Sequence, residues 1–118
     1  MAYAKCKVFD LKDNTNYELG MDFDYGKLLI SNYIDLNVFA HKTFLIDQSG
    51  KFDRSLTRFI DWDFVLRYTR RSAPFFLDKV MCNYHILPKT NSITINNDYA
   101  HNYSLIRSRH NRFLLDGR

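Results

Sequence analysis

Three stretches of the chain alternate between apolar and polar side chains, which is the pattern of a β-strand with one buried face. The first stretch covers residues 3–9, and the others cover residues 34–41 and 76–86. Asp13 and Asn14 follow the first stretch, and both residue types tolerate the left-handed backbone of a tight turn. The pattern therefore predicts three strands, with a turn after the first.

Helical periodicity follows the second and third strands. The clearest helix is predicted over residues 53–71 with Thr57 as its N-cap, after a shorter helix over residues 42–49 that Gly50 ends. A last helix is predicted over residues 97–115, because its apolar side chains recur at intervals of three and four residues. This stripe consists of Tyr99, Tyr103, Ile106, His110 and Phe113. His110 is the polar member of the stripe and is expected to be a hydrogen-bonded core or boundary residue.

These elements, with one or two further helical turns at residues 25–31, predict an α/β fold in which a small mixed sheet packs against helices. A chain of 118 residues, 46% hydrophobic and 25% charged, is long enough for one domain with a real core. No apolar run approaches the roughly 20 residues that span a bilayer, and residues 1–9 lack the continuous apolar stretch of a signal peptide. We therefore expect a soluble, unprocessed single domain over residues 1–118.

The net charge of +4 is concentrated at the C-terminal end of the chain. Residues 99–118 carry four arginines and one aspartate, whereas residues 1–98 are nearly balanced. A basic end of this kind can bind the phosphates of nucleic acid or of an anionic membrane surface, and it can equally be the solvated face of a terminal helix. One alternative function is therefore a small basic nucleic-acid-binding or assembly module.

Little in the composition indicates a metal site or a covalent nucleophile. Cys6 and Cys82 lie in alternating stretches and are expected to be buried free thiols in a reducing, cytoplasmic setting. The four histidines have no ligand spacing, and the acidic triplet at residues 22–24 does not follow a buried strand that would present it to Mg²⁺ or Mn²⁺. No metal site is predicted in this chain. His85 lies on the more polar side of its strand and is a candidate for lining a cleft.

The segment from Gly50 to Arg70 carries a more specific signal. It contains a Gly-Lys-Phe-Asp turn, an Ile-Asp-Trp-Asp motif at residues 60–63 and a Leu-Arg pair at residues 66–67. In this order and spacing, the segment closely resembles the acceptor-side segment of family 2 glycosyltransferases.

Other parts of the chain extend this resemblance to roughly residues 1–95. Residues 28–34, Leu-Leu-Ile-Ser-Asn-Tyr-Ile, resemble the approach to the acceptor cleft in these enzymes. Residues 80–84 and Pro88 resemble a strand that ends in a Tyr-containing motif. The resemblance implies that the chain is the C-terminal, acceptor-side half of a GT-A-type domain.

The resemblance also implies a reaction, the transfer of a sugar from a nucleotide-sugar to an acceptor hydroxyl, usually with inversion at the anomeric carbon. Such a displacement needs a base that takes the proton of the hydroxyl. Asp61 matches the base of the family. Asp63 matches a position with a supporting role at most, and it is expected to pair with Arg67 on the surface of the helix. The remaining acceptor or cleft candidates are Asn32, Asp35, Trp62 and His85.

Three departures from the family pattern limit what the chain can do alone. Ile60 stands where an acidic residue often precedes the base, and Leu87 stands where many members have a histidine. The donor-binding half would precede Met1, so we expect Mg²⁺ or Mn²⁺ only with the full-length domain, and little turnover from this chain.

The implied partners are a sugar acceptor and, in the full-length enzyme, the nucleotide-sugar donor. The expected location is the cytoplasm, including the inner face of the membrane. An unpaired strand edge would favour a homodimer.

Overall fold

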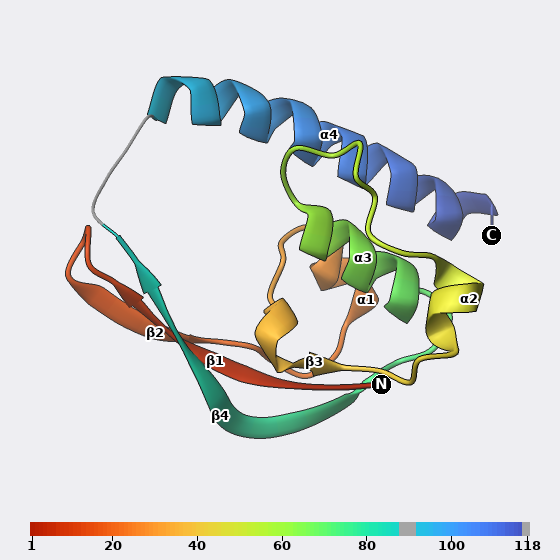
Figure 1. Cartoon of the computed structure of the whole chain (residues 1–118), viewed down its shortest axis with the longest axis horizontal. Helices are drawn as coiled ribbons and strands as arrows, with labels where there is room; N and C mark the ends of the chain where they lie inside the picture. Colours follow the sequence, from red (N-terminus) through yellow and green to blue (C-terminus); the bar gives the residue numbers. More distant parts are fainter. Residues whose placement is uncertain (88–91, 117–118) are drawn as a thin grey trace.

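The computed structural model describes residues 1–87 and 92–116, with the side chains of the last helix described from residue 98 to residue 112. It is a small mixed α/β structure, as the sequence predicts at this level. Its sheet is built around β1, Ala2–Asp10, which lies along the parallel strand β4, Phe75–Ile86 (Figure 1). The opposite edge of β1 pairs antiparallel with two short strands, β2, Thr15–Leu19, and β3, Phe39–Ala40.

The helices lie on one side of this sheet, in layers that Figure 1 shows from the edge. The short helix α1, Tyr25–Leu28, and the central helix α3, Ile60–Thr69, lie nearest to the sheet, and α4, Ser92–Asp116, lies beyond α3. The 3₁₀ turn η1, Leu36–Val38, and the short helix α2, Leu45–Ser49, connect β3 to the segments on either side.

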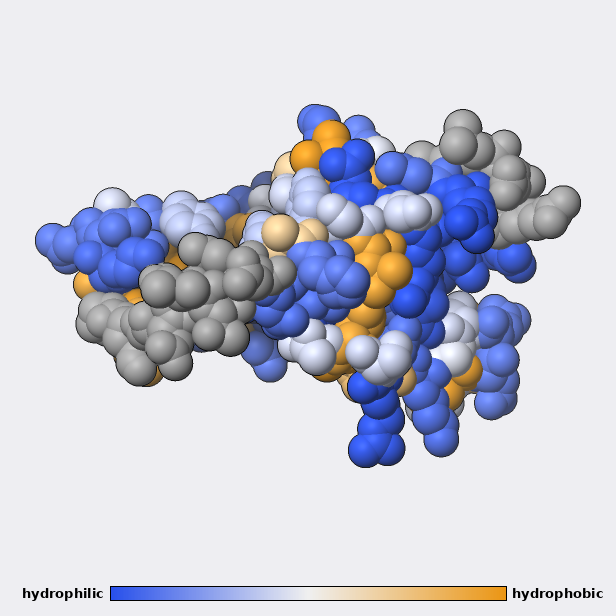
Figure 2. All heavy atoms as spheres, turned by 90° about the horizontal axis from the view of Figure 1, so that it is seen from above, coloured by the Kyte–Doolittle hydropathy of each residue, from blue (hydrophilic) through white to orange (hydrophobic). Residues whose placement is uncertain are grey.

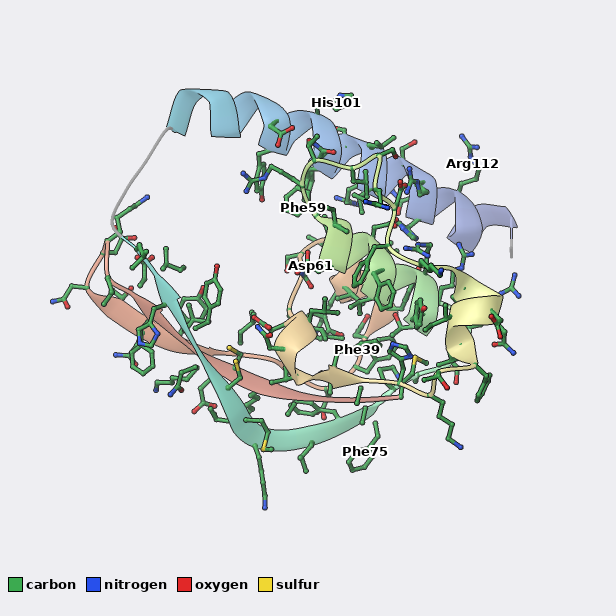
Figure 3. All side chains as sticks on the ribbon, in the orientation of Figure 1. Phe39, Phe59, Asp61, Phe75, His101 and Arg112 are labelled. Atoms are coloured by element: carbon green, nitrogen blue, oxygen red, sulfur yellow. The ribbon has the colours of Figure 1, made fainter. Side chains whose placement is uncertain are left out.

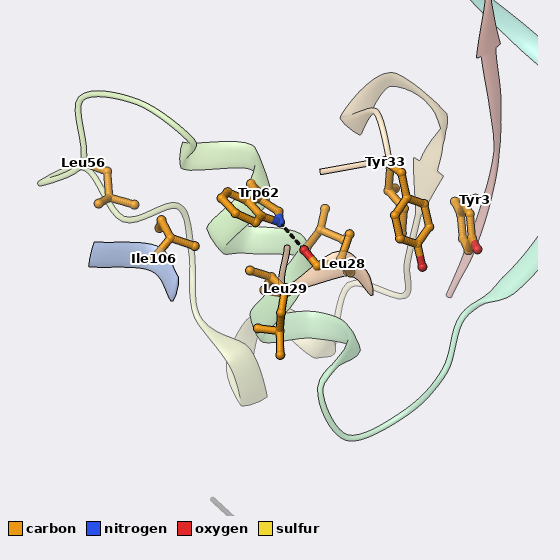
Figure 4. Close-up of a cluster of buried hydrophobic side chains, with 10 residues drawn as sticks. Tyr3, Leu28, Leu29, Tyr33, Leu56, Trp62 and Ile106 are labelled. Atoms are coloured by element: carbon orange, nitrogen blue, oxygen red, sulfur yellow. Dashed lines mark hydrogen bonds between the residues drawn. The ribbon is translucent and has the colours of Figure 1, made fainter. Parts of the chain in front are cut away.

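The core fills the space between these layers (Figure 4). Trp62 of α3 is its largest fully buried side chain, and the Trp62 indole nitrogen donates a hydrogen bond to the Leu28 carbonyl oxygen at 2.7 Å. Tyr3 of β1 and Ile106 of α4 lie at the two ends of the same cluster. One continuous apolar cluster therefore joins the sheet, α1, α3 and α4.

The strand predicted over residues 34–41 is mostly absent. The Asp35 side chain accepts a hydrogen bond from the Asn37 backbone nitrogen at 2.8 Å and caps η1, so only Phe39 and Ala40 remain extended and paired. The physical reason lies in the sheet, because β2 already occupies most of this edge of β1.

The central helix begins later than predicted, at Ile60. Its N-cap is Phe59, which has a left-handed backbone (φ 60°), whereas the Thr57 hydroxyl donates to an Asp98 carboxylate oxygen in α4. The prediction of Thr57 as the cap was wrong because its hydroxyl has this distant partner. The cap of the preceding helix was predicted correctly, since Gly50 ends α2 with a φ of 84°.

The last helix begins earlier than predicted, at Ser92, so that Asp98 lies within it. In its described part, Ile106 and His110 are fully buried and Tyr99 is exposed, which places the predicted stripe partly at the edge of the core. The predicted contribution of the Phe113 side chain falls outside the described residues. Among the residues that the structure describes, no helix combines the length and apolar character that crossing a bilayer requires.

The face of the sheet that points away from the helices carries exposed apolar side chains. Phe75 is 68% exposed and Met81 is 63% exposed, and both belong to the edge strand β4 (Figure 3 labels Phe75). Long, apolar edge strands tend to pair with another chain. The homodimer predicted from the sequence remains a prediction, and β4 is the strand on which it would form.

Candidate functional site

Asp61 lies in the first turn of α3, where Phe59 and Ile60 precede it at the start of the helix (Figure 3). The left-handed backbone at Phe59 turns the chain into the helix, so the side chains on either side of this turn surround a common space. An open hollow of about 450 Å³ occupies that space, and the half-buried Asp61 is part of its wall. The other lining residues are Leu36, Phe52, Arg58, Phe59 and Ile60.

A second hollow, of about 310 Å³, shares the side chains of Leu36 and Phe52 with the first. Aromatic rings line most of it. The ring centroids of Phe52 and Phe64 are 4.4 Å apart, and those of Phe64 and Tyr68 are 4.0 Å apart, both in stacked arrangements. The remaining lining residues are Phe39, His41, Ile46 and Lys51. Apolar, aromatic hollows with a few polar groups at the rim are typical ligand sites.

Asp61 alone supplies a carboxylate among the described residues that line these two hollows. A larger hollow of about 570 Å³ lies between α2 and the end of α3, with Lys42 and Arg67 in its wall, and Asp61 does not line it. Asp61 therefore lines the first of the two adjoining hollows and not this larger one.

The segment that brings Phe52 to Asp61 is fixed by the far end of α3. The Arg67 guanidinium donates hydrogen bonds to the Ser49 and Lys51 carbonyl oxygens, and the Tyr68 hydroxyl donates to the Gly50 carbonyl oxygen at 2.7 Å. A Cβ at Gly50 would lie 3.3 Å from an Arg67 guanidinium nitrogen, and the positive φ there favours glycine. The Gly-Lys-Phe-Asp turn is thus held against the helix that carries Asp61.

Trp62 and Asp63 directly follow Asp61 in the sequence, but both are buried and neither lines the first hollow. Trp62 is a core residue with 1% exposure, so it is not available to contact an acceptor. The prediction that it is a cleft residue was wrong because its indole ring and its nitrogen are both used in the core.

Asp63 forms a pair with Arg67, as the spacing of four residues predicts, but the pair is not on the surface. The Asp63 carboxylate is fully buried and accepts hydrogen bonds from the Arg67 side chain at 2.9 Å and the Arg109 side chain at 3.1 Å. His110 Nε2 lies 2.8 Å from the same carboxylate. Burial by itself would raise the pKa of Asp63, but the His110 hydrogen bond and the Arg67 charge outweigh it, so the pKa lies below its usual range.

Arg109 extends this buried cluster to the Gly-Lys-Phe-Asp turn, since its guanidinium also lies 2.9 Å from an Asp53 carboxylate oxygen. Hydrogen bonds from the Ser55 side chain and backbone, together with the Arg109 side chain, lower the pKa of Asp53 to about 2. The cluster ties α4, α3 and the turn together. Arg109 is therefore a structural residue and not simply part of a solvated helix face.

The two lowered carboxyl pKa values predict how stability depends on pH. A carboxyl with a depressed folded-state pKa stabilises the fold above its unfolded value of about 3.9 and loses this effect as the pH falls through the folded value. We expect the free energy of unfolding to decrease between about pH 4 and pH 2, where Asp53 titrates. Urea unfolding at a series of pH values measures this, and Asp53→Asn should flatten the slope. An equally steep slope in that variant would contradict the role of Asp53.

Two further arginines on the α4 side lie over aromatic rings. The Arg58 guanidinium lies over the rings of Phe59 and Tyr99, and the Arg107 guanidinium lies over the ring of Tyr103. Figure 2, which views the molecule onto α4, shows a mainly hydrophilic surface with smaller apolar patches.

The structure does not bring the three remaining candidates to Asp61. Asn32 and Asp35 each accept a hydrogen bond from a backbone nitrogen two residues later, which shapes the approach to η1. His85 is exposed on β4, and its ring stacks on Phe9 with the centroids 5.0 Å apart. None of the three is in the walls of the hollows found among the described residues.

Sequence reasoning missed Phe39, His41 and Phe52 as residues of the site. The sequence indicated only one of the three, because Phe52 is part of the Gly-Lys-Phe-Asp motif, whereas Phe39 and His41 belong to no motif. In the part of the chain that the structure describes, no group of three or more His, Cys, Asp or Glu side chains is placed to hold a metal ion. Comparison of the chain with protein-family models, with curated proteins and with solved structures gave no match.

Proposed function

We propose that this chain is the acceptor-side portion of a glycosyltransferase that resembles family 2, and that Asp61 is its general base. The observation that carries the proposal is the position of Asp61, which lines an open hollow that adjoins an aromatic one. The ordered motif around Asp61 supports the same role. The expected reaction moves a sugar from a nucleotide-sugar to an acceptor hydroxyl, with inversion.

Asp61 would act by taking the proton of the acceptor hydroxyl while the hydroxyl oxygen attacks the anomeric carbon of the donor. The nucleotide-sugar would bind outside the two hollows. Mg²⁺ or Mn²⁺ is expected only with the full-length domain, and the described residues include no group of three or more His, Cys, Asp or Glu side chains placed to hold such an ion.

The aromatic hollow would hold the sugar ring of the acceptor. Sugar rings have a face of C–H groups that packs well on aromatic side chains, and their hydroxyls can hydrogen-bond to polar groups at the rim, here His41 and Lys51. Leu36 and Phe52 line both hollows, so an acceptor whose ring is held in the aromatic hollow would extend past these two side chains into the first hollow, where its hydroxyl would meet Asp61.

Acceptor binding can be tested with this chain alone. We expect a panel of mono- and oligosaccharides, screened by ligand-observed NMR, to include members that bind. Replacing Phe52 by alanine should weaken this binding about tenfold, because it removes an exposed wall of both hollows (about 1.4 kcal/mol).

Phe44→Ala is the matched control, since Phe44 is also exposed, at 53% against 44% for Phe52, and lies outside the two hollows. It should leave saccharide binding unchanged. Equal losses in both variants, or a panel in which no saccharide binds at millimolar concentration, would contradict an acceptor site in these hollows.

A further inference from the structure

The two cysteines of the chain lie side by side in the sheet. Cys6 is fully buried on β1, Cys82 is half-buried on the adjacent strand β4, and the two sulfur atoms are 3.5 Å apart. Both are free thiols. Neither thiol takes part in the hollows around Asp61, so the function proposed above does not account for the pair.

An irregularity in strand pairing creates this arrangement. Lys5 pairs with Val80, but the next residue, Cys6, pairs with Cys82, so β4 has one extra residue, Met81, at this point. With regular pairing, Cys6 would face Met81 and Cys82 would face the next residue of β1. Bulges of this kind redirect side chains and recur where a particular side chain must be presented.

The pairing is also compatible with the Cα separation that a disulfide requires. Paired residues of neighbouring strands have Cα atoms about 4.8 Å apart, within the range of about 4.4–6.8 Å that disulfides span. Side chains at paired positions point to the same face of the sheet, as the contact between the two sulfur atoms confirms. Rotation about the Cα–Cβ bonds can therefore bring the sulfurs to bonding distance without separating the strands.

We propose that Cys6 and Cys82 are a site of reversible disulfide formation, oxidised by a small-molecule disulfide such as oxidised glutathione. The Cys82 thiolate, on the partly accessible side, attacks one sulfur of the oxidant, forms a mixed disulfide and releases one glutathione thiolate. The Cys6 thiol then loses its proton and attacks the Cys82 sulfur, releasing the second glutathione as a thiolate that takes up a proton. The cysteine pair loses two electrons, which reduce the oxidant to two thiols.

The environments of the two thiols fit this order of events. Burial raises the pKa of the Cys6 thiol to about 12, and the hydrogen bond with Cys82 adds to the effect, so Cys6 is a poor first nucleophile. Cys6 reacts only in the second step, when the Cys82 sulfur next to it is part of the mixed disulfide. The resulting bond would close a loop from residue 6 to residue 82 that contains α1, α2 and α3, and a loop of this length restricts the unfolded chain strongly.

The test is to incubate the folded chain with oxidised glutathione and to measure its intact mass under non-reducing conditions. We expect a monomer lighter by two hydrogen atoms, a peptide in which Cys6 is joined to Cys82, and a higher urea midpoint that dithiothreitol reverses. Cys6→Ser should stop at the glutathione adduct, and Cys82→Ser should not react while folded.

Circular dichroism establishes that each variant is folded, and Cys6→Ala replaces Cys6→Ser if the buried hydroxyl prevents folding. A wild-type chain that remains reduced, that accumulates only the glutathione adduct, or that forms disulfide-linked dimers would overturn the proposal. These outcomes do not depend on whether Asp61 is a catalytic base.

Discussion

Asp63→Asn should lower the free energy of unfolding by about 3–5 kcal/mol, the usual cost of removing one partner from a buried ionic cluster. The Asp63 carboxylate is fully buried and is shared by the side chains of Arg67, Arg109 and His110. The neutral amide cannot balance two guanidinium groups, and its NH₂ group would face donors where an acceptor is needed. A loss of this size is a large fraction of the 5–15 kcal/mol that stabilises an ordinary domain.

Urea denaturation measures this prediction, with Asp47→Asn as the control. The control makes the same chemical change at an exposed position of α2, where substitutions usually alter stability by less than about 0.5 kcal/mol. Similar stabilities for the two variants would show that the buried cluster does not support the fold. The effect should also be larger than that of Arg107→Ala, because Arg107 lies over Tyr103 and not in the cluster.

Two strands, β1 and β4, and the cap at Gly50 were predictable because their signals lie in neighbouring residues, whereas β2 was not predicted. Strict alternation predicted β1 and β4 close to their observed bounds, and Gly50 predicted the end of α2. The second predicted strand failed because strand pairing depends on the partner edge, and β2 had already taken most of that edge of β1. Alternation within residues 34–41 contains no information about that competition.

The candidate site was predictable only in part, for a similar reason. The motif singled out Asp61, and the apolar stripe of α4 predicted correctly that His110 is a hydrogen-bonded core residue. Burial of Asp63 was not predictable from its spacing to Arg67, because its other partners lie more than forty residues later in α4. The walls around Asp61 likewise come from η1 and from the turn at Phe52, which approach α3 only in the folded chain.

Asp61→Asn should abolish most sugar transfer while leaving the fold intact. A positioned general base contributes about 10²- to 10⁴-fold to the rate, and asparagine cannot accept the hydroxyl proton. Asp61 is half-buried at the rim of the hollow and accepts one hydrogen bond, from the Trp62 backbone nitrogen, which the amide oxygen of asparagine can also accept. Stability and saccharide binding should therefore change little, in contrast to Asp63→Asn.

The most direct test of the account is the rate of sugar transfer from a nucleotide-sugar to an acceptor, in the chain joined to a donor-binding half, for the wild type, Asp61→Asn and Asp47→Asn. We expect Asp61→Asn to be about 10²- to 10⁴-fold slower, with donor and acceptor binding retained, and Asp47→Asn to equal the wild type. Transfer by Asp61→Asn at the wild-type rate would contradict the assignment of Asp61 as the base.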